Sequence, residues 1–140
     1  MLWLALAMLA AVAGGANARA AADVSCPAEI VVTERITPAK GWSVRAGERR
    51  RPLSGIGFFS GPPEQKAALV NDDEQAGADG TVATWHFPPA KEHYFVACYY
   101  RDTRTTLTRE LPSALTTCRV TYAKPPEGSS SLEPKSMTCE

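Results

Sequence analysis

From residue 23 onward, the chain is divided by proline and glycine into short runs in which apolar and polar side chains alternate. A period of two is typical of strands that bury one face. The runs are also rich in Val, Thr, Tyr and Phe, which favour strands. The pattern predicts strands over residues 30–36, 52–60, 81–87, 94–101, 105–111 and 117–123, and a short last strand that ends at Cys139.

The alternation also predicts which side chains are buried. Ala83, Trp85 and Phe87 fall on one face of the strand over 81–87, and we expect that face to point into the core. Tyr100 is a second expected core aromatic, in the strand over 94–101. Glycines within 52–60 predict a bulge or a close backbone approach.

One short helix is predicted, over residues 65–70, because two prolines and Glu64 precede it as in a first helical turn. The runs over 94–101, 105–111 and 117–123 follow one another across short turns, which predicts an antiparallel meander. The predicted fold class is mainly β. We expect a single small antiparallel β domain, built as a meander, a sandwich or a partly open barrel, with at most one short helix and two disulfides.

The first twenty residues differ from the rest because they are almost wholly apolar or small. The apolar stretch is too short to span a bilayer as a helix and ends in small residues, which predicts a signal peptide over residues 1–20. Cleavage is expected near residues 18–22, after Ala18, Ala20 or Ala22. The alternative is a short uncleaved anchor. The mature chain, residues 23–140, is expected to be one disulfide-stabilised β domain with no membrane span, located in the periplasm or secreted.

Export gives the four cysteines a structural meaning. An even number of cysteines in an oxidising compartment predicts two disulfides, for which three connectivities exist. In a meander, Cys98 and Cys118 lie two strands apart, about 10 Å, beyond the roughly 7 Å that a bridge allows. A last strand folded back along 117–123 places Cys118 opposite Cys139. The preferred pairs are therefore Cys118 with Cys139 and Cys26 with Cys98.

The charge balance excludes one class of partner. The chain has 15 Lys and Arg against 15 Asp and Glu, so it lacks the basic field of a nucleic-acid binder. One local excess stands out, Arg49, Arg50 and Arg51. Guanidinium groups match carboxylates and phosphates, so the cluster is a candidate contact for an anionic polymer or an acidic partner. The alternative is a charged loop or a guard on a strand edge.

Metal sites and catalytic sites find little support. His86 and His93 flank a predicted hairpin turn and would form a metal site with Glu92 if they approached each other, but two surface histidines explain the pattern equally well. We predict no cofactor and no metal.

The acidic stretch Asn71-Asp72-Asp73-Glu74, followed by Asp79, lacks the full pattern of a calcium loop, so we expect a solvated connector. Ser54 and Ser60 lie beside glycines without the spacing of a nucleophile elbow. No catalytic residue is predicted, and the chain is not expected to be an enzyme.

Several short motifs occur in a fixed order along the mature chain. They are Cys26-Pro27, Gly41-Trp42, Phe58-Phe59-x-Gly61-x-Pro63, Trp85, Cys98-x-Tyr100, Leu111-Pro112, Cys118-x-Val120-x-Tyr122 and Cys139. In this order the chain resembles a small family of exported proteobacterial proteins of unknown function. The resemblance implies export and a compact domain, and it supplies no activity.

The predicted function is that of an exported, non-enzymatic β domain that binds a protein or a cell-envelope component. Inhibitors and immunity proteins directed at cell-wall hydrolases are the nearest analogy in size, compartment and architecture. Two alternatives stay open: a periplasmic structural or assembly accessory that acts through a sheet edge, and an enzyme whose site the sequence does not reveal. The identity of the partner and the oligomeric state are left open.

Overall fold

The computed structural model describes residues 23–89 and 93–140, and this part of the chain forms nine strands and one 3-10 turn. The predicted signal peptide, residues 1–20, and its cleavage near residues 18–22 lie outside the described residues. The strands are β1 (Glu29–Glu34), β2 (Gly47–Ser60), β3 (Ala68–Leu69), β4 (Asp73–Gly77), β5 (Gly80–His86), β6 (Tyr94–Tyr100), β7 (Thr106–Glu110), β8 (Thr117–Ala123) and β9 (Pro134–Cys139).

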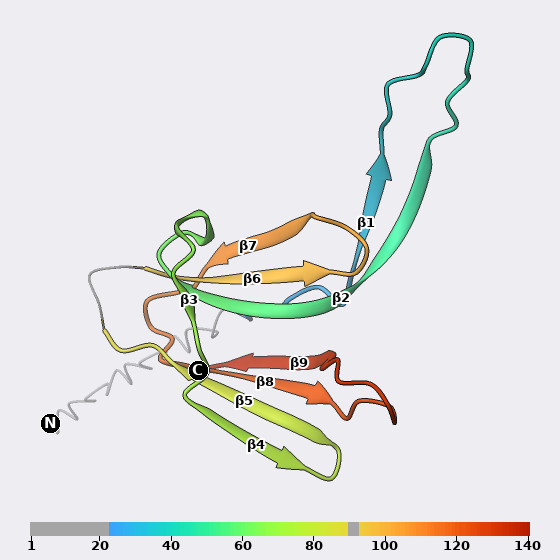
Figure 1. The fold of residues 1–140 in the computed structure, drawn as a ribbon. Helices are drawn as coiled ribbons and strands as arrows, with labels where there is room; N and C mark the ends of the chain where they lie inside the picture. The colour runs from blue at the N-terminus through green and yellow to red at the C-terminus, as the bar shows by residue number, and fades with distance from the viewer. Residues whose placement is uncertain (1–22, 90–92) are drawn as a thin grey trace, which may run out of the picture.

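The strands form two antiparallel sheets, which Figure 1 shows one above the other. The first has the order β1-β2-β6-β7, with the short β3 added beside β2, and the second has the order β4-β5-β8-β9. The predicted fold class is confirmed: the chain is a small, mainly β domain of antiparallel strands, with no helix longer than one 3-10 turn among its described residues. None of the helical structure in residues 23–89 and 93–140 is long and apolar enough to cross a membrane.

The core lies between the two sheets and is built around Phe58 of β2, which is 1% exposed. Its ring contacts Trp85 of β5, with centroids 4.8 Å apart, and Phe87, with centroids 5.4 Å apart. The indole Nε1–H of Trp85 donates to the carbonyl oxygen of Leu69 at 3.2 Å, so the polar atom of this buried ring has a partner. Ala83, Trp85 and Phe87 are all buried, as predicted.

Two disulfides tie the chain together. Cys26 bridges to Cys98 of β6, with Cα atoms 5.7 Å apart, and fixes the segment before β1 to the first sheet. Cys118 bridges to Cys139, which lies directly opposite it in the β8–β9 register. These are the two pairs preferred from the sequence.

The predicted meander is wrong in its third strand. β6 and β7 are neighbours, but β8 lies in the second sheet between β5 and β9. All five residues of β7 are exposed, whereas Leu111, directly after it, is buried in the shared core. The buried residues of β8, Cys118 and Val120, belong to the core beside Trp85 of β5, which pairs with Cys118. Cys98 and Cys118 therefore lie in different sheets. The distance between them in a meander is not the reason that they form no disulfide with each other.

The predicted helix over residues 65–70 is also wrong. A 3-10 turn, η1 (Pro63–Gln65), ends at Lys66, whose backbone is left-handed with φ 61°. The chain then pairs with the edge of β2 as β3, and Leu69 packs against the core. Hydrogen bonds to β2 and burial of Leu69 outweigh the weak helix preference of the segment.

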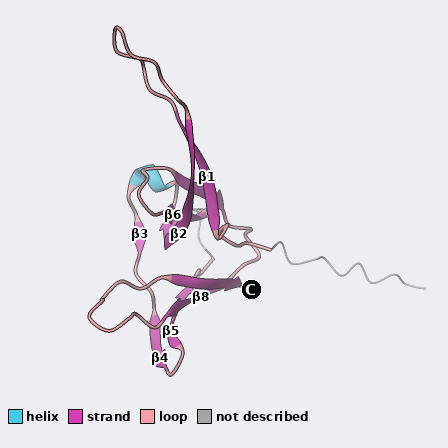
Figure 2. Cartoon of the chain, turned by 90° about the vertical axis from the view of Figure 1, so that its right-hand side faces the viewer, coloured by secondary structure: helices cyan, strands magenta, loops and turns pink. Residues whose placement is uncertain are grey.

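β2 is longer than predicted, since it begins at Gly47 rather than at residue 52. Residues 47–52 pair with β1, whereas Leu53 and residues 55–60 pair with β6, and the register shifts between Leu53 and Gly55. A bulge at this point bends a strand and increases its twist. The β1–β2 hairpin consequently extends away from the other strands of the two sheets (Figures 1 and 2). We call residues 29–52 the arm and the remaining described residues the body.

Candidate interaction surfaces

The predicted arginine cluster lies on β2, at the base of the arm. The three arginines are paired across the arm with Val32, Val31 and Ile30 of β1. Successive side chains of a strand point to opposite faces, so Arg49 and Arg51 share one face and Arg50 lies on the other. The cluster is therefore part of a strand and not a loop, and its three guanidinium groups do not form one patch.

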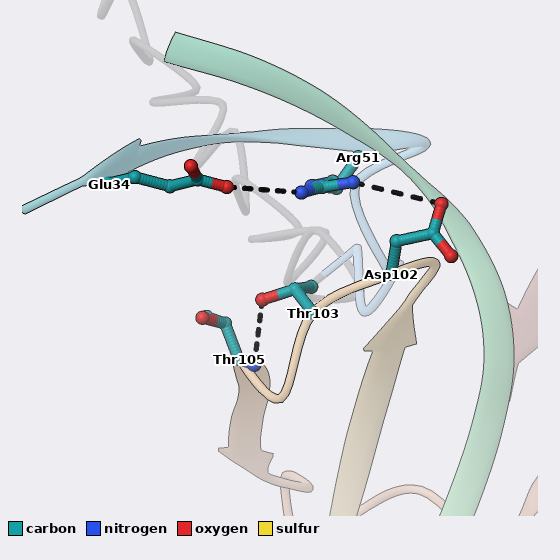
Figure 3. A network of polar contacts seen from close by, with 5 residues as sticks. All are labelled: Glu34, Arg51, Asp102, Thr103 and Thr105. Atoms are coloured by element: carbon teal, nitrogen blue, oxygen red, sulfur yellow. Dashed lines mark hydrogen bonds and ion pairs between the residues drawn. The ribbon is translucent and has the colours of Figure 1, made fainter. Parts of the chain in front are cut away.

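Arg51 ties the arm to the body (Figure 3). Its side chain is only 12% exposed, and its guanidinium lies 3.4 Å from the carboxylate of Glu34 and 3.7 Å from that of Asp102. Asp102 belongs to the turn after β6, where the hydroxyl of Thr103 also accepts a hydrogen bond from the backbone N–H of Thr105 at 3.1 Å. The buried Nε of Arg51 has no hydrogen-bond partner among the described residues. Through these two ion pairs, Arg51 of β2 links β1 to the β6–β7 turn.

The other two arginines are open to solvent. Arg50 forms an ion pair with Glu29, and its side chain is 75% exposed. Arg49 makes no ion pair or hydrogen bond through its side chain within residues 23–89 and 93–140. Exposed ion pairs contribute little to stability, so both guanidinium groups are available for contact with another molecule.

The tip of the arm, residues 35–46, carries exposed apolar side chains that the sequence analysis did not single out as a site. Trp42 is 77% exposed and Ile36 is 67% exposed, and Val44 is also exposed. The backbone N–H of Trp42 donates to the carbonyl oxygen of Ala39 at 3.0 Å, which closes a tight turn. Gly41, with φ 84°, takes the third position of that turn, where a type II turn requires a positive φ. The available signal was a short alternation outside the predicted strands, in which Trp42, Val44 and Ala46 are separated by Ser43 and Arg45.

The two histidines do not come together. β5 and β6 belong to different sheets, so the hairpin turn predicted between His86 and His93 is wrong. His86 lies 3.4 Å from the carboxylate of Asp72, and His93 contacts the carboxylate of Glu110. Glu92 lies outside the described residues.

The acidic residues after β3 are only partly a connector. Asp73 and Glu74 belong to β4, which pairs with β5 and is exposed along its length. These residues are therefore solvated, as expected, but they form a strand and not a connecting loop. Asp72 accepts a hydrogen bond from the backbone N–H of His86 at 2.7 Å. Over residues 23–89 and 93–140, no three His, Cys, Asp or Glu side chains are grouped so that they would hold a metal ion.

Three concave surfaces lie on the described residues of the body, one of them between Cys26, Ile56 and Met137. A pocket of about 220 Å³ opens at the end of the core between Phe87, Tyr94, Leu111 and Leu115. A wider and more open groove follows the outer face of β6 and β7. There the ring of Tyr99 lies over Gly55 and Gly57 of β2, close enough that a Cβ on Gly57 would meet it at 3.3 Å.

Burial alters the acidity of two tyrosines of the body. Burial raises the pKa of Tyr100, whose hydroxyl donates to the carbonyl oxygen of Pro27 at 3.0 Å. Burial also raises the pKa of Tyr122, and the negative charge of Glu74 raises it further. Both effects favour the neutral phenol, which suits a structural role.

Comparison with known proteins places this fold in a family. The chain is 28% identical over 121 residues to an uncharacterised 16.3 kDa protein in the trpG 5' region of Azospirillum brasilense, a similarity that covers 81% of this chain and 79% of that protein. No solved structure matches the chain significantly. The family model described as type VI secretion system Tli immunity protein matches residues 47–140, which include β2 to β9 and both members of the Cys118–Cys139 bridge. This chain therefore belongs to the Tli immunity protein family of type VI secretion systems.

Proposed function

We propose that this immunity protein is exported and protects the cell that makes it by binding a toxic effector protein in the periplasm. Membership of the immunity family implies a partner protein and fits an inhibitor that works by binding.

The two disulfides are the observation that carries the periplasmic location. Cytosolic thiols are kept reduced, so disulfides persist mainly in exported proteins. The bridges close loops with sequence separations of 72 and 21 residues, and no cysteine among the described residues is left free. Loops of this length give estimated contributions of about 4 and 3 kcal/mol, comparable to the stability of a whole small domain. A domain that depends on such bridges is best suited to an oxidising compartment, to which the apolar residues 1–20 would direct it.

Inhibition by binding, rather than by a reaction, accounts for the distribution of polar groups in the body. Both described histidines are engaged with single carboxylates, and the buried tyrosine hydroxyl of Tyr100 is engaged with a backbone carbonyl. The family description names no target. A cell-wall hydrolase as the effector therefore stays a prediction, and the accessory role has no observation in its favour.

A competition experiment between sister strains tests the proposal. The recipient lacks the gene for this chain, and the attacker is the parental strain with an active type VI secretion system. We expect the full chain to restore survival of the recipient, whereas residues 23–140 alone, retained in the cytoplasm, should not. A secretion-deficient attacker is the control.

The two parts of the proposal fail differently. If the full chain does not improve survival against the active attacker, the immunity function is wrong for these strains. If the cytoplasmic form protects as well as the exported form, binding takes place in the cytoplasm and the periplasmic location is wrong.

A further inference from the structure

The arm is unusual because it contributes nothing to the core. Every residue from 33 to 50 is exposed, and no residue of the arm is among the buried core residues of the described chain. Away from the body it is a two-stranded ribbon, a form that is marginally stable in water without a third strand or a packed face. Folding of the body does not account for such an extension, so its use must be sought outside the molecule.

The base of the arm is nevertheless firmly held. Arg51 bridges Glu34 on β1 and Asp102 on the β6–β7 turn (Figure 3). On either side of β2, the backbone N–H of Leu53 donates to the carbonyl oxygen of Ala28 at 2.8 Å, and that of Arg101 donates to the carbonyl oxygen of Pro52 at 3.0 Å. The Cys26–Cys98 bridge fixes the chain shortly before β1. An element held in one direction loses less conformational freedom on binding, which favours affinity.

The arm and the body differ in net charge. The arm has six Lys and Arg against three Asp and Glu, a net charge of +3. The rest of residues 23–140 has eight against twelve, a net charge of −4. Within the described residues the basic side chains at the tip, Arg35, Lys40 and Arg45, have no ion-pair partner. Their charge is therefore available to a partner of opposite sign.

The apolar side chains at the tip place a second requirement on the partner, which must offer an apolar surface. Trp42 and Ile36 expose large apolar surfaces next to these basic groups. Tryptophan and arginine are the residues most enriched at the centres of protein interfaces, where the aromatic ring fills a pocket that excludes water. A flat anionic membrane would meet Glu48 on the same arm, whose carboxylate has no ion-pair partner within the described residues and disfavours such a membrane.

We propose that the tip of the arm is the effector-binding element and that it inserts into a cleft of the effector with an apolar floor and a rim of carboxylates. Trp42 occupies the floor, and the tip cations pair with the rim. This inference rests on the proposed function, since it names the surface through which the immunity protein holds its effector. The family match begins at Gly47, so the tip and β1 lie outside the matched segment. A contact made there is suited to select one effector while the matched body supplies the scaffold.

The test uses the same sister strains and compares matched changes on the two regions. On the tip the changes are Trp42→Ala and Arg45→Glu. On the body the matched changes are Val70→Ala, at an apolar residue that is 84% exposed, and Lys124→Glu, at an exposed cation. We expect each tip variant of the full chain to lower recipient survival by at least about tenfold and the body variants to leave it unchanged, because a few residues at the centre of an interface carry most of the binding energy. Trp42→Phe, which keeps an aromatic ring, should restore most of the protection.

The design separates this inference from the proposed function. Loss of protection by the unaltered chain would count against the function itself. Protection by the unaltered chain and, within about twofold, by both tip variants would overturn the arm as the binding element. Melting temperature and periplasmic abundance of each variant are measured alongside, and tip variants that melt like the unaltered chain but fail to protect support the inference.

A lipid target is tested directly. Sedimentation with vesicles of phosphatidylethanolamine and phosphatidylglycerol is measured for the full-length protein and for Trp42→Ala. Binding that depends on Trp42, together with unchanged protection by Trp42→Ala, would assign the tip to lipid and overturn the inference. Absence of vesicle binding, together with loss of protection by Trp42→Ala, supports a protein partner.

Discussion

The arm and the β5–β8 pair are both antiparallel and strand-like in sequence, but they place their apolar side chains in opposite environments. In the body, Trp85 and Val120 point inward and are buried against Phe58 of the other sheet. In the arm, Val31 of β1 and Trp42 at the tip face solvent. Alternation of apolar and polar residues thus builds a core only where a second sheet covers the apolar face.

The two regions also differ in what holds them. The body is stabilised by buried aromatic side chains and by the two disulfides. The arm is held at its base by the Arg51 ion pairs and along β1 and β2 by backbone pairing. We therefore expect substitutions in the body to alter the free energy of unfolding, and substitutions at the tip to alter protection alone.

The largest effect is expected from loss of the disulfides. Replacing Cys26 and Cys98 by Ala should lower the free energy of unfolding by about 4 kcal/mol, and replacing Cys118 and Cys139 by about 3 kcal/mol, because the first pair closes the longer loop. Urea denaturation of the two double variants measures both. Removing all four cysteines should leave the domain unfolded at ordinary temperature.

The state of the cysteines in the unaltered protein is the control. Protein recovered from the periplasm and alkylated under denaturing, non-reducing conditions should carry no label, because residues 23–89 and 93–140 contain no free cysteine. Two or four labelled cysteines, or a peptide that joins Cys98 to Cys118, would contradict the observed pairing.

The next effect compares two tryptophans. Trp85 is 7% exposed and packs against Phe58, so Trp85→Ala should lower the free energy of unfolding by about 3 to 5 kcal/mol. Trp42→Ala removes an exposed ring and should change it by less than about 0.5 kcal/mol. Thermal melting of the two variants distinguishes the regions directly. Equal melting temperatures would mean that the core is not where the structure places it.

A smaller effect concerns the buried tyrosines, which are confined to the body. Because the pKa values of Tyr100 and Tyr122 are raised above 10.0, the folded state keeps their phenolic protons to a higher pH than the unfolded state does. Their contribution is therefore complete below about pH 10 and is lost as the pH rises through the folded-state values. Urea midpoints measured across this range should fall with pH, and Tyr122→Phe should reduce the fall. At neutral pH, Tyr100→Phe should cost about 1 kcal/mol through the lost hydrogen bond to Pro27.

Much of the body could be predicted from local pattern. Period-two alternation located the strand at Thr117–Ala123 with its observed bounds and identified the buried face that contains Trp85. Pairing of the last strand followed from the two cysteines, since placing Cys118 opposite Cys139 also places Val120 opposite Met137. These features depend on neighbours in sequence or on one short connection.

The errors share a physical cause, which is that they depend on which sheet covers which segment. Local pattern cannot show that β8 leaves the meander for the second sheet, or that Leu69 gains more from the β2 edge than from a helix. For the same reason, local pattern did not predict the exposed arm. Arg49 and Arg51 look like loop residues in the sequence. They nevertheless belong to the first, mostly exposed half of β2, which no second sheet covers. Exposure of Trp42 follows only from the direction in which the bulge after Leu53 sends the hairpin.

The smallest expected effects separate the three arginines at the base of the arm. Arg51→Gln removes a guanidinium that is largely buried between Glu34 and Asp102 and should lower stability by about 1 kcal/mol, a fall of about 4 °C in the melting temperature. Arg49→Gln and Arg50→Gln alter exposed side chains and should leave stability within about 0.5 kcal/mol. Survival of the recipient strain is then measured for the same three variants and compared with their melting temperatures. If the effector contact extends from the tip to the base, Arg49→Gln lowers protection without a change in melting temperature, because its charge has no partner within the described chain. If Arg51→Gln proves as neutral to melting as Arg49→Gln, the ion pairs of Arg51 do not hold the arm, and the firm base on which the docking proposal depends is lost.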